Sequence, residues 1–206
     1  MQIGIIDYGA SNIFSVLRAI SFLGAKTKIV TNSEELKSVD KIILPGQGSM
    51  GSCIENLKKN DLFENLKKSL SERPYLGICL GLQVLFSMSE ESPNDQGLNI
   101  FPEKVERFVI KENLKIPHMG WNQVEFKKDH FINKNIPNSS NFYFVHSFAS
   151  KKLIKKNIFA QTDHGEIFNS AVLHDNIVGV QFHPEKSGDI GPVSYTHLRA
   201  HETRED

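Results

Sequence analysis

The segment Pro74-Tyr-Leu-Gly-Ile-Cys-Leu-Gly-Leu-Gln83 is the most informative part of this sequence of 206 residues. Its first half, residues 75–78, is a short apolar run that is typical of a buried strand. Leu82, Leu85 and Phe86 follow at helical spacing. The pattern therefore predicts a strand, a sharp turn and then a helix.

Cys79 lies at this turn, between Gly77 and Gly81. The arrangement G-x-C-x-G is the thiol counterpart of the nucleophile elbow, whose tight turn requires small flanking residues. The first N–H groups of the following helix, together with its dipole, favour the thiolate over the thiol. For Cys79 taken alone, a buried and inert cysteine is an equally good interpretation.

A second group of residues, Gly179-Val-Gln-Phe-His-Pro-Glu185, lies about a hundred positions downstream. His183 follows an apolar run at residues 177–182 that predicts a strand, and open α/β sheets place their sites at the carboxyl ends of strands. His183 can transfer protons, and Glu185 can orient its imidazole. A Cys with a distant His and carboxylate predicts thiolate catalysis, and acyl transfer is the first chemistry to test.

The segment Lys41-Ile-Ile-Leu-Pro-Gly-Gln-Gly48 reads as a strand that ends in a glycine-flanked loop. Backbone N–H groups in such a loop can bind a developing oxyanion, a role that needs small residues and no particular side chain. A Pro-Gly-x-Gly turn is weak support on its own, because most such turns are only turns.

The order of strand and helix signals predicts an α/β fold with three layers, αβα, in one domain at residues 1–191. The central sheet is expected to be mostly parallel, with an antiparallel extension built from short strands after residue 105. Residues 54–70 predict two helices that break near residues 60–61, and residues 88–102 predict a polar loop. The expected strands are residues 3–6, 28–30, 42–44, 75–78, 105–110, 121–126, 142–148, 158–161, 171–173 and 177–182.

The composition excludes several classes of function. Lys plus Arg and Asp plus Glu both number 24, so nothing electrostatic indicates nucleic acid or an anionic membrane. No apolar run is long enough to span a bilayer, and the start of the chain reads as a strand rather than a signal peptide. Two cysteines make no disulfide framework. We expect a soluble cytoplasmic protein without a metal or other cofactor.

Three of these segments together resemble the class I (triad) glutamine amidotransferases. They are Gly77-Ile-Cys-Leu-Gly-Leu-Gln83, Pro45-Gly-Gln-Gly48 and Phe182-His-Pro-Glu-Lys186. Three more segments narrow the resemblance to the glutaminase subunits of imidazole glycerol phosphate synthases, and it extends from about residue 2 to about residue 191. These segments are Asp7-Tyr-Gly-Ala-Ser-Asn12, Pro117-His-Met-Gly-Trp-Asn122 and Tyr143-Phe-Val-His-Ser147.

The resemblance implies a role for each site residue. Cys79 attacks the side-chain amide of glutamine, His183 moves protons, and Glu185 orients His183. Backbone N–H groups form the oxyanion hole, and two side chains hold the substrate. The oxyanion residues are Gly46, Gln47 and Leu80, and the substrate-binding residues are Gln83 and Glu91, with Glu91 holding the α-amino group. From the residues alone, Glu91 would be read as part of a solvated acidic surface.

The resemblance also implies a heterodimer with a cyclase subunit. Ammonia passes through that partner to a phosphoribosyl substrate, giving imidazole glycerol phosphate and an aminoimidazole carboxamide ribotide in histidine biosynthesis. His118, Met119, Trp121 and Lys186 are implied to lie near the partner surface. Without the resemblance, a packed strand and an interface are equally good interpretations of Trp121.

Two departures from the family pattern leave other functions open. The first loop carries Ala10-Ser11 where a glycine is usual before Asn12, and Gln47 stands where a small or apolar residue is more usual. One alternative is a paralogous glutaminase that feeds ammonia to another synthase, for example in surface-sugar amidination. A redox-sensing α/β cysteine protein and a catalytically idle binding subunit are the others, and the His183-Glu185 pair argues against both.

Residues 192–206 do not fit the family pattern. The family continues here into an apolar helix, whereas only Val193, Tyr195 and Leu198 are strongly apolar in this stretch. We therefore expect a non-native or disordered tail.

Overall fold

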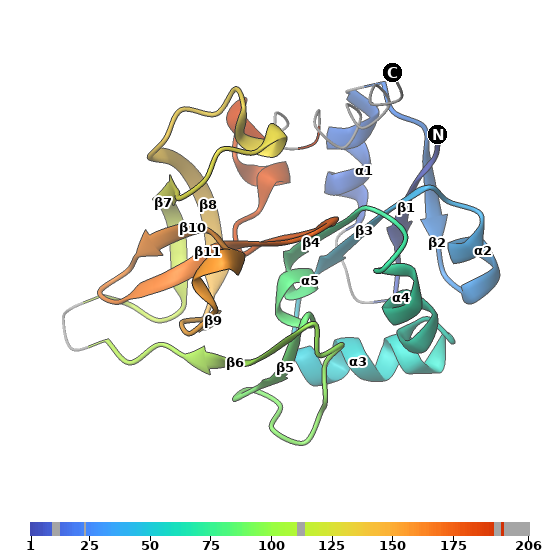
Figure 1. The fold of residues 1–206 in the computed structure, drawn as a ribbon, viewed down its shortest axis with the longest axis horizontal. Coiled ribbons are helices and arrows are strands. Elements are labelled where there is room, and N and C mark those ends of the chain that lie inside the picture. Colours follow the sequence, from blue (N-terminus) through green and yellow to red (C-terminus); the bar gives the residue numbers. More distant parts are fainter. Residues whose placement is uncertain (10–12, 23, 111–113, 192–194, 196–206) are drawn as a thin grey trace.

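The computed structural model describes residues 1–206 except 10–12, 23, 111–113, 192–194 and 196–206. A nine-stranded sheet runs through the molecule in the order β2-β1-β3-β4-β12-β11-β10-β7-β8, and β5, β6 and β9 form a second, smaller sheet (Figure 1). The strands are β1 Ile3–Ile6, β2 Thr27–Val30, β3 Lys41–Gly46, β4 Tyr75–Cys79, β5 Phe86–Ser89, β6 Phe101–Arg107, β7 His118–Phe126, β8 Ser140–His146, β9 Phe148–Ser150, β10 Ile158–Asp163, β11 Ile167–His174 and β12 Ile177–Val180.

Helices cover both faces of the parallel half of the sheet (Figure 1). Their α-helical segments are α1 Ile13–Phe22, α2 Ser33–Lys37, α3 Met50–Lys59, α4 Phe63–Ser69 and α5 Leu80–Gln83, and the 3₁₀ turns are η1 Phe131–Asn133, η2 Lys155–Asn157 and η3 Pro184–Lys186. The apolar side of α1 packs into one core cluster, and the apolar sides of α3 and α4 pack into another. Burial of these two apolar faces is what holds the three layers together.

The predicted αβα architecture is confirmed. Strands β2, β1, β3, β4 and β12 are parallel, and β11, β10, β7 and β8 extend the same sheet with antiparallel pairs. The chain enters the extension at β7 and returns through β12, which pairs with β4. The break between α3 and α4 also lies where the sequence predicts it. Helix α3 ends at Lys59 and α4 begins at Phe63, and Asp61 between them takes a positive φ of 56°.

Two local expectations are wrong. Phe86, predicted on the helix after Cys79, begins β5 instead, because α5 ends at Gln83. Residues 88–102 are not simply a loop, since Ser89 pairs with Val105 and Phe86 pairs with Phe101 in the smaller sheet. Apolar residues in so short a segment do not distinguish a helical turn from a strand.

The expectation of a tail at residues 192–206 lies outside the described residues, apart from Tyr195. The side chain of Tyr195 is buried in the core cluster that includes α1.

Candidate active site

The turn at Cys79 has the backbone geometry of a nucleophile elbow. Cys79 takes a positive φ of 53° with ψ at −102°, a conformation that non-glycine residues rarely adopt and that persists only where the surroundings enforce it. A Cβ at Gly77 would lie 2.3 Å from the Gly81 carbonyl oxygen, and a Cβ at Gly81 would lie 1.9 Å from the Leu44 carbonyl oxygen. Both positions therefore require glycine, as the pattern predicts.

His183 is placed beside this turn by strand pairing. Strands β4 and β12 are parallel neighbours, with Ile78 opposite Val180, so the residues that follow them meet at one edge of the sheet. The backbone N–H of His183 donates to the Tyr143 carbonyl at 2.9 Å, which holds the histidine against β8. Glu185 Oε1 lies 2.8 Å from His183 Nδ1, and both side chains are buried.

The electrostatics of His183 are set by its two partners. Burial by itself lowers the pKa of His183, but the hydrogen bond and negative charge of the Cys79 sulfur, together with the Glu185 carboxylate, raise it to about 10. Its Nε2 is buried and has no hydrogen-bond partner in the described part of the chain. A buried, unpartnered ring nitrogen beside a cysteine is typical of a site that completes its hydrogen bonds only with a substrate.

Gln181 is a site residue that the sequence analysis missed. Its side chain is fully buried, its Nε2 lies 3.5 Å from Cys79 Sγ, and its Oε1 accepts a 3.2 Å hydrogen bond from Gln83 Nε2. Gln181 therefore links the cysteine to Gln83. The only signal in the sequence was its position two residues before His183, which places both side chains on one side of an extended segment.

The loop after β3 lies against the elbow, with Gly46 paired to Cys79 in the sheet register. A Cβ at Gly46 would lie 2.6 Å from Leu80 Cβ, so glycine permits this close approach. The Gln47 N–H donates to Tyr8 Oη at 3.2 Å, and the same hydroxyl is 3.3 Å from the Gln47 carbonyl oxygen. The Gln47 peptide is thus held by Tyr8, which the sequence analysis did not single out.

A cavity of about 390 Å³ opens in front of the cysteine. Most of the predicted catalytic, oxyanion and substrate-binding residues line it, except Glu185 and Gly46, and residues of the β8–β9 segment line it as well. The lining residues are Gln47, Gly48, Cys79, Leu80, Gln83, Glu91, Pro117, Val145, His146, Ser147, Phe148, His183 and Lys186.

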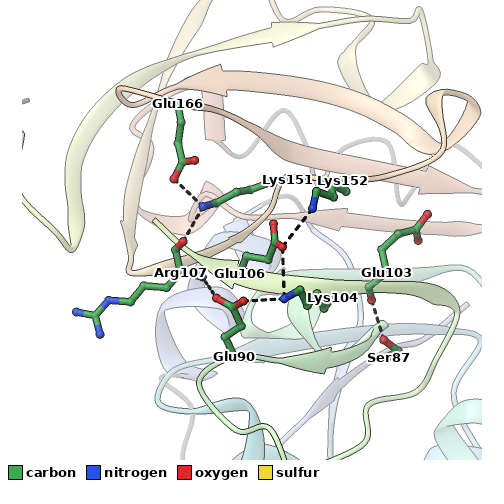
Figure 2. A network of polar contacts seen from close by, with 9 residues as sticks. All are labelled: Ser87, Glu90, Glu103, Lys104, Glu106, Arg107, Lys151, Lys152 and Glu166. Carbon is green, nitrogen blue, oxygen red and sulfur yellow. Dashed lines mark hydrogen bonds and ion pairs between the residues drawn. The ribbon is translucent and has the colours of Figure 1, made fainter. Parts of the chain in front are cut away.

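Glu91 reaches this cavity from the segment that follows β5. Its Oε2 accepts a 3.3 Å hydrogen bond from the Met50 N–H. The neighbouring Glu90 is bonded to Lys104 at 2.8 Å and to the Arg107 N–H at 2.9 Å (Figure 2). Charged contacts that continue to Lys151 and Glu166 join the smaller sheet to the β10–β11 hairpin (Figure 2). This network fixes the segment that carries Glu91.

The four residues expected near a partner surface do not all lie on the surface. Met119 and Trp121 are 62% and 57% exposed. Lys186 is also exposed, and its Nζ lies 5.9 Å from the centroid of the Tyr143 ring. His118 is only 3% exposed, because alternation along β7 turns it inward while its neighbour Met119 points out. The His118 side chain therefore lies inside the protein and not on that surface.

Other classes of site are not evident within the described ranges. They contain no cluster of three or more His, Cys, Asp or Glu side chains that could hold a metal ion. None of the described helices combines the length and the apolar character needed to cross a membrane.

Known proteins resemble this chain over most of its length. The family described as glutamine amidotransferase class-I matches residues 4–198. The imidazole glycerol phosphate synthase subunit HisH of Methanocaldococcus jannaschii is 47% identical over 191 residues, covering 92% of this chain and 94% of the relative. The HisH subunit of Sulfurimonas denitrificans is 42% identical over 194 residues, covering 92% and 93%.

Solved structures support the fold. A glutamine amidotransferase crystal structure matches with a TM-score of 0.75 at 18% identity, and PurLQS from Thermotoga maritima matches with a TM-score of 0.74 at 17% identity. Each alignment covers 96% of this chain and 97% of the other. The fold, the elbow cysteine and the family match together define a class-I glutamine amidotransferase, and the chain belongs to that family. Within it, the chain belongs to the HisH subunits of imidazole glycerol phosphate synthase.

Proposed function

We propose that this chain releases ammonia from glutamine and delivers it to a cyclase subunit, as the glutaminase of imidazole glycerol phosphate synthase in histidine biosynthesis. The observation that carries the proposal is the buried group at the ends of β4 and β12, where Cys79 lies beside a His183 that is paired with Glu185 at 2.8 Å. We assign this activity to a single amidotransferase domain at residues 1–191.

In the proposed reaction, Cys79 Sγ attacks the carboxamide carbon of glutamine and forms a tetrahedral intermediate. His183 Nε2 holds the proton that comes from the Cys79 thiol and gives it to the departing nitrogen, so that ammonia leaves and a thioester remains. Water then attacks the thioester with His183 as the base, which releases glutamate and restores the thiol. Glu185 orients the imidazole and stabilises its charged form.

The proposed oxyanion hole uses backbone N–H groups at Gly46, Gln47 and Leu80. In the structure the Gln47 N–H is directed to the Tyr8 hydroxyl. It can bind an oxyanion only after that hydrogen bond is exchanged, so we propose that the free chain is a weak glutaminase until its partner reorients this peptide. A trapped thioester in which the Gln47 N–H still points to Tyr8 would contradict this step.

Gln83 and Glu91 are proposed to hold the substrate glutamine. Both line the cavity in front of Cys79. The carboxylate of Glu91 is suited to the α-ammonium group, since opposite charges attract and the segment that carries it is anchored by the Glu90 contacts.

The cyclase partner is proposed to bind where Met119, Trp121 and Lys186 are exposed. Trp and Met are enriched at protein interfaces, and Trp121 packs edge-on against Tyr143 with ring centroids 6.2 Å apart. The partner would use the ammonia to form imidazole glycerol phosphate and an aminoimidazole carboxamide ribotide. A cytoplasmic location is part of this proposal, supported by two free and buried thiols, Cys53 and Cys79.

The leading alternative is a paralogous glutaminase with a different acceptor synthase. The identities of 47% and 42% to HisH subunits over nearly the whole chain favour the imidazole glycerol phosphate synthase over this alternative.

The test is glutamine hydrolysis by the purified chain, measured alone and then with the cyclase subunit and its nucleotide ligand. We expect weak hydrolysis alone and strong stimulation by the partner. Hydrolysis that the cyclase does not stimulate would keep the glutaminase chemistry and contradict the proposed partner. No hydrolysis by a folded complex would contradict the proposal as a whole.

A further inference from the structure

The proposed reaction does not use two buried histidines at the glutamine cavity, of which His146 lines the cavity and His118 lies behind it. His118 on β7 is 3% exposed and His146 on β8 is 7% exposed. They face one another across the antiparallel pair of strands, and His118 Nδ1 lies 3.0 Å from His146 Nε2. One of these two nitrogens has to carry a proton and the other has to be bare for this contact to be a hydrogen bond.

Asn122 determines which nitrogen is bare. Its Oδ1 accepts from the Gln123 N–H at 2.8 Å, which identifies the other carboxamide atom as the nitrogen. That nitrogen donates to the Asp163 carbonyl at 2.8 Å and lies 3.2 Å from His118 Nε2. An amide nitrogen can only donate, so His118 Nε2 accepts and a neutral His118 carries its proton on Nδ1.

The same logic continues into His146. The proton on His118 Nδ1 is donated to His146 Nε2, so a neutral His146 carries its own proton on Nδ1. His146 Nδ1 is 2.9 Å from the Phe148 carbonyl, which can only accept. Each ring in this chain of contacts thus has one tautomer that satisfies both of its neighbours.

The Phe148 carbonyl is the point where this chain of hydrogen bonds meets the active site. It accepts from His146 Nδ1 at 2.9 Å and from Gln83 Nε2 at 3.1 Å, which uses both of its lone pairs. The second N–H of Gln83 donates to Gln181 Oε1, and Gln181 Nε2 lies 3.5 Å from Cys79 Sγ. Because both N–H groups of Gln83 are used, its carboxamide can offer a ligand only the oxygen.

We propose that His118 and His146 act as a neutral, one-directional hydrogen-bond relay that positions Phe148 and Gln83, and that Gln83 Oε1 is thereby held as an acceptor for an N–H group of the substrate glutamine. His118 and His146 are positioning residues in this proposal, since neither is required to touch the reacting atoms. The proposal rests on the proposed glutaminase function and extends it to a further part of the glutamine site.

The surroundings of the two rings keep them neutral. Burial lowers the pKa of His118 to about 4 and that of His146 to about 3, and the neighbouring histidines lower both further. Apolar rings pack around them, with Phe144 stacked on His118 at 4.7 Å and Phe108 against His146 at 5.2 Å between ring centroids. A relay that depends on one bare nitrogen in each ring requires this neutral state.

The first test is the tautomeric state of the wild-type chain in its complex with the cyclase subunit, measured at neutral pH by ¹⁵N NMR of labelled histidine. We expect His118 and His146 both to be protonated on Nδ1 and bare on Nε2. Protonation of Nε2 in either ring, or a charged imidazolium, would overturn the relay whether or not the complex hydrolyses glutamine.

The second test uses two substitutions that each keep one half of the His146 contacts. In His146→Asn the amide nitrogen can take the place of Nδ1 and still donate to Phe148, whereas in His146→Gln the side-chain oxygen can replace Nε2 but the donor to Phe148 is lost. We expect KM for glutamine to rise about tenfold in His146→Gln and less than about threefold in His146→Asn, with kcat changed less than about threefold in both.

His164→Asn is the matched control, because His164 stacks on His118 at 4.0 Å but bonds to the Lys115 carbonyl and lies outside the relay. We expect it to leave KM unchanged. Equal KM values for the two His146 variants, or a fall in kcat without a rise in KM, would overturn the positioning role. A wild-type complex that hydrolyses no glutamine would contradict the proposed function instead, and the NMR result would still decide the relay.

Discussion

His183 and His146 line the same cavity and are both buried, yet their pKa values move in opposite directions. The pKa of His183 is raised to about 10 and that of His146 is lowered to about 3. Burial opposes the charged form of both rings. The difference lies in what each ring touches, since His183 has a carboxylate and a negatively charged sulfur for neighbours while His146 has a carbonyl and another imidazole.

This contrast separates two uses of histidine in one site. A ring held beside opposite charges keeps its proton at neutral pH and can deliver it to a leaving group, because its charged form is stabilised. A ring held between a neutral donor and a neutral acceptor is suited to fix the geometry of its neighbours. We therefore expect substitutions near His183 to act mainly on kcat, and substitutions near His146 to act mainly on KM.

The largest effect is expected for Cys79→Ala, which removes both the nucleophile and one of the groups that raise the pKa of His183. Glutamine-dependent synthesis by the complex should fall on the order of 10⁴-fold or more. Synthesis from added ammonia should stay unchanged, because the partner does not need the thiol. Loss of both activities would contradict the assigned role. In ¹⁵N NMR the pKa of His183 should fall while that of His146 stays low.

Glu185→Gln is expected to have the next largest effect. It removes the carboxylate 2.8 Å from His183 Nδ1, so the pKa of His183 should fall and kcat should drop on the order of 10²- to 10⁴-fold. Steady-state kinetics of the complex would measure kcat, with Glu125→Gln as a control because Glu125 is exposed and pairs with Lys127. A variant with unchanged kcat would show that the His183–Glu185 pair is structural only.

The two kinds of histidine should also give opposite pH dependence of stability. His183 gains protons on folding because its pKa is raised from an ordinary value of about 6.5. Its contribution is therefore complete below about pH 6.5 and is lost as the pH rises through about 10, falling by about 2 kcal/mol between about pH 7 and about pH 9. His183→Asn should flatten this alkaline limb in urea unfolding curves.

His146 works in the other direction. Its pKa is lowered, so the unfolded chain binds the proton more tightly and the contribution of His146 is complete only above about pH 6.5. It is lost as the pH falls towards about 3, by about 1 to 2 kcal/mol between about pH 7 and about pH 5. His146→Asn should flatten the acid limb only. If His146→Asn changed the pH dependence of stability equally on the alkaline side, this would contradict the contrast between His146 and His183.

The smallest effect is expected for Asn122→Asp, which places a carboxylate beside His118 as Glu185 stands beside His183. The new side chain can only accept, so His118 Nε2 must take a proton and the pKa of His118 should rise by about one unit or more. NMR titration would measure this change, and Asn141→Asp is a control because Asn141 is an exposed residue on β8. An unchanged His118 would show that Asn122 does not direct the relay.

The general architecture follows from local patterns in the sequence. Apolar runs at residues 3–6, 42–44 and 75–78 identify the parallel strands, because strands buried on both faces are continuously apolar. The glycines around Cys79 predict the elbow, and the clashes at Gly77 and Gly81 confirm their requirement. The same reasoning failed at Phe86, where a short apolar segment suits a helix and a strand equally well.

The residues missed at the site share one property. Tyr8, His146 and Gln181 act through polar contacts with residues distant in sequence, such as the contact of Tyr8 with Gln47 and that of Gln181 with Cys79. Nothing in the local spacing of these residues distinguishes a bonded side chain from a merely buried one. The burial of His118 was also not evident from the sequence, since only the register of β7 shows which of its side chains face inward.

The sequence by itself predicted the nucleophile and its distant His-Pro-Glu partner and determined the αβα class, because these depend on residue type, spacing and periodicity within short segments. Only the tertiary structure decided that β12 returns beside β4, that Tyr8 holds the Gln47 peptide, and that two histidines meet behind Gln83. The physical reason is that hydrogen-bond direction and pKa depend on the groups packed around a side chain, and packing brings together residues far apart in the chain.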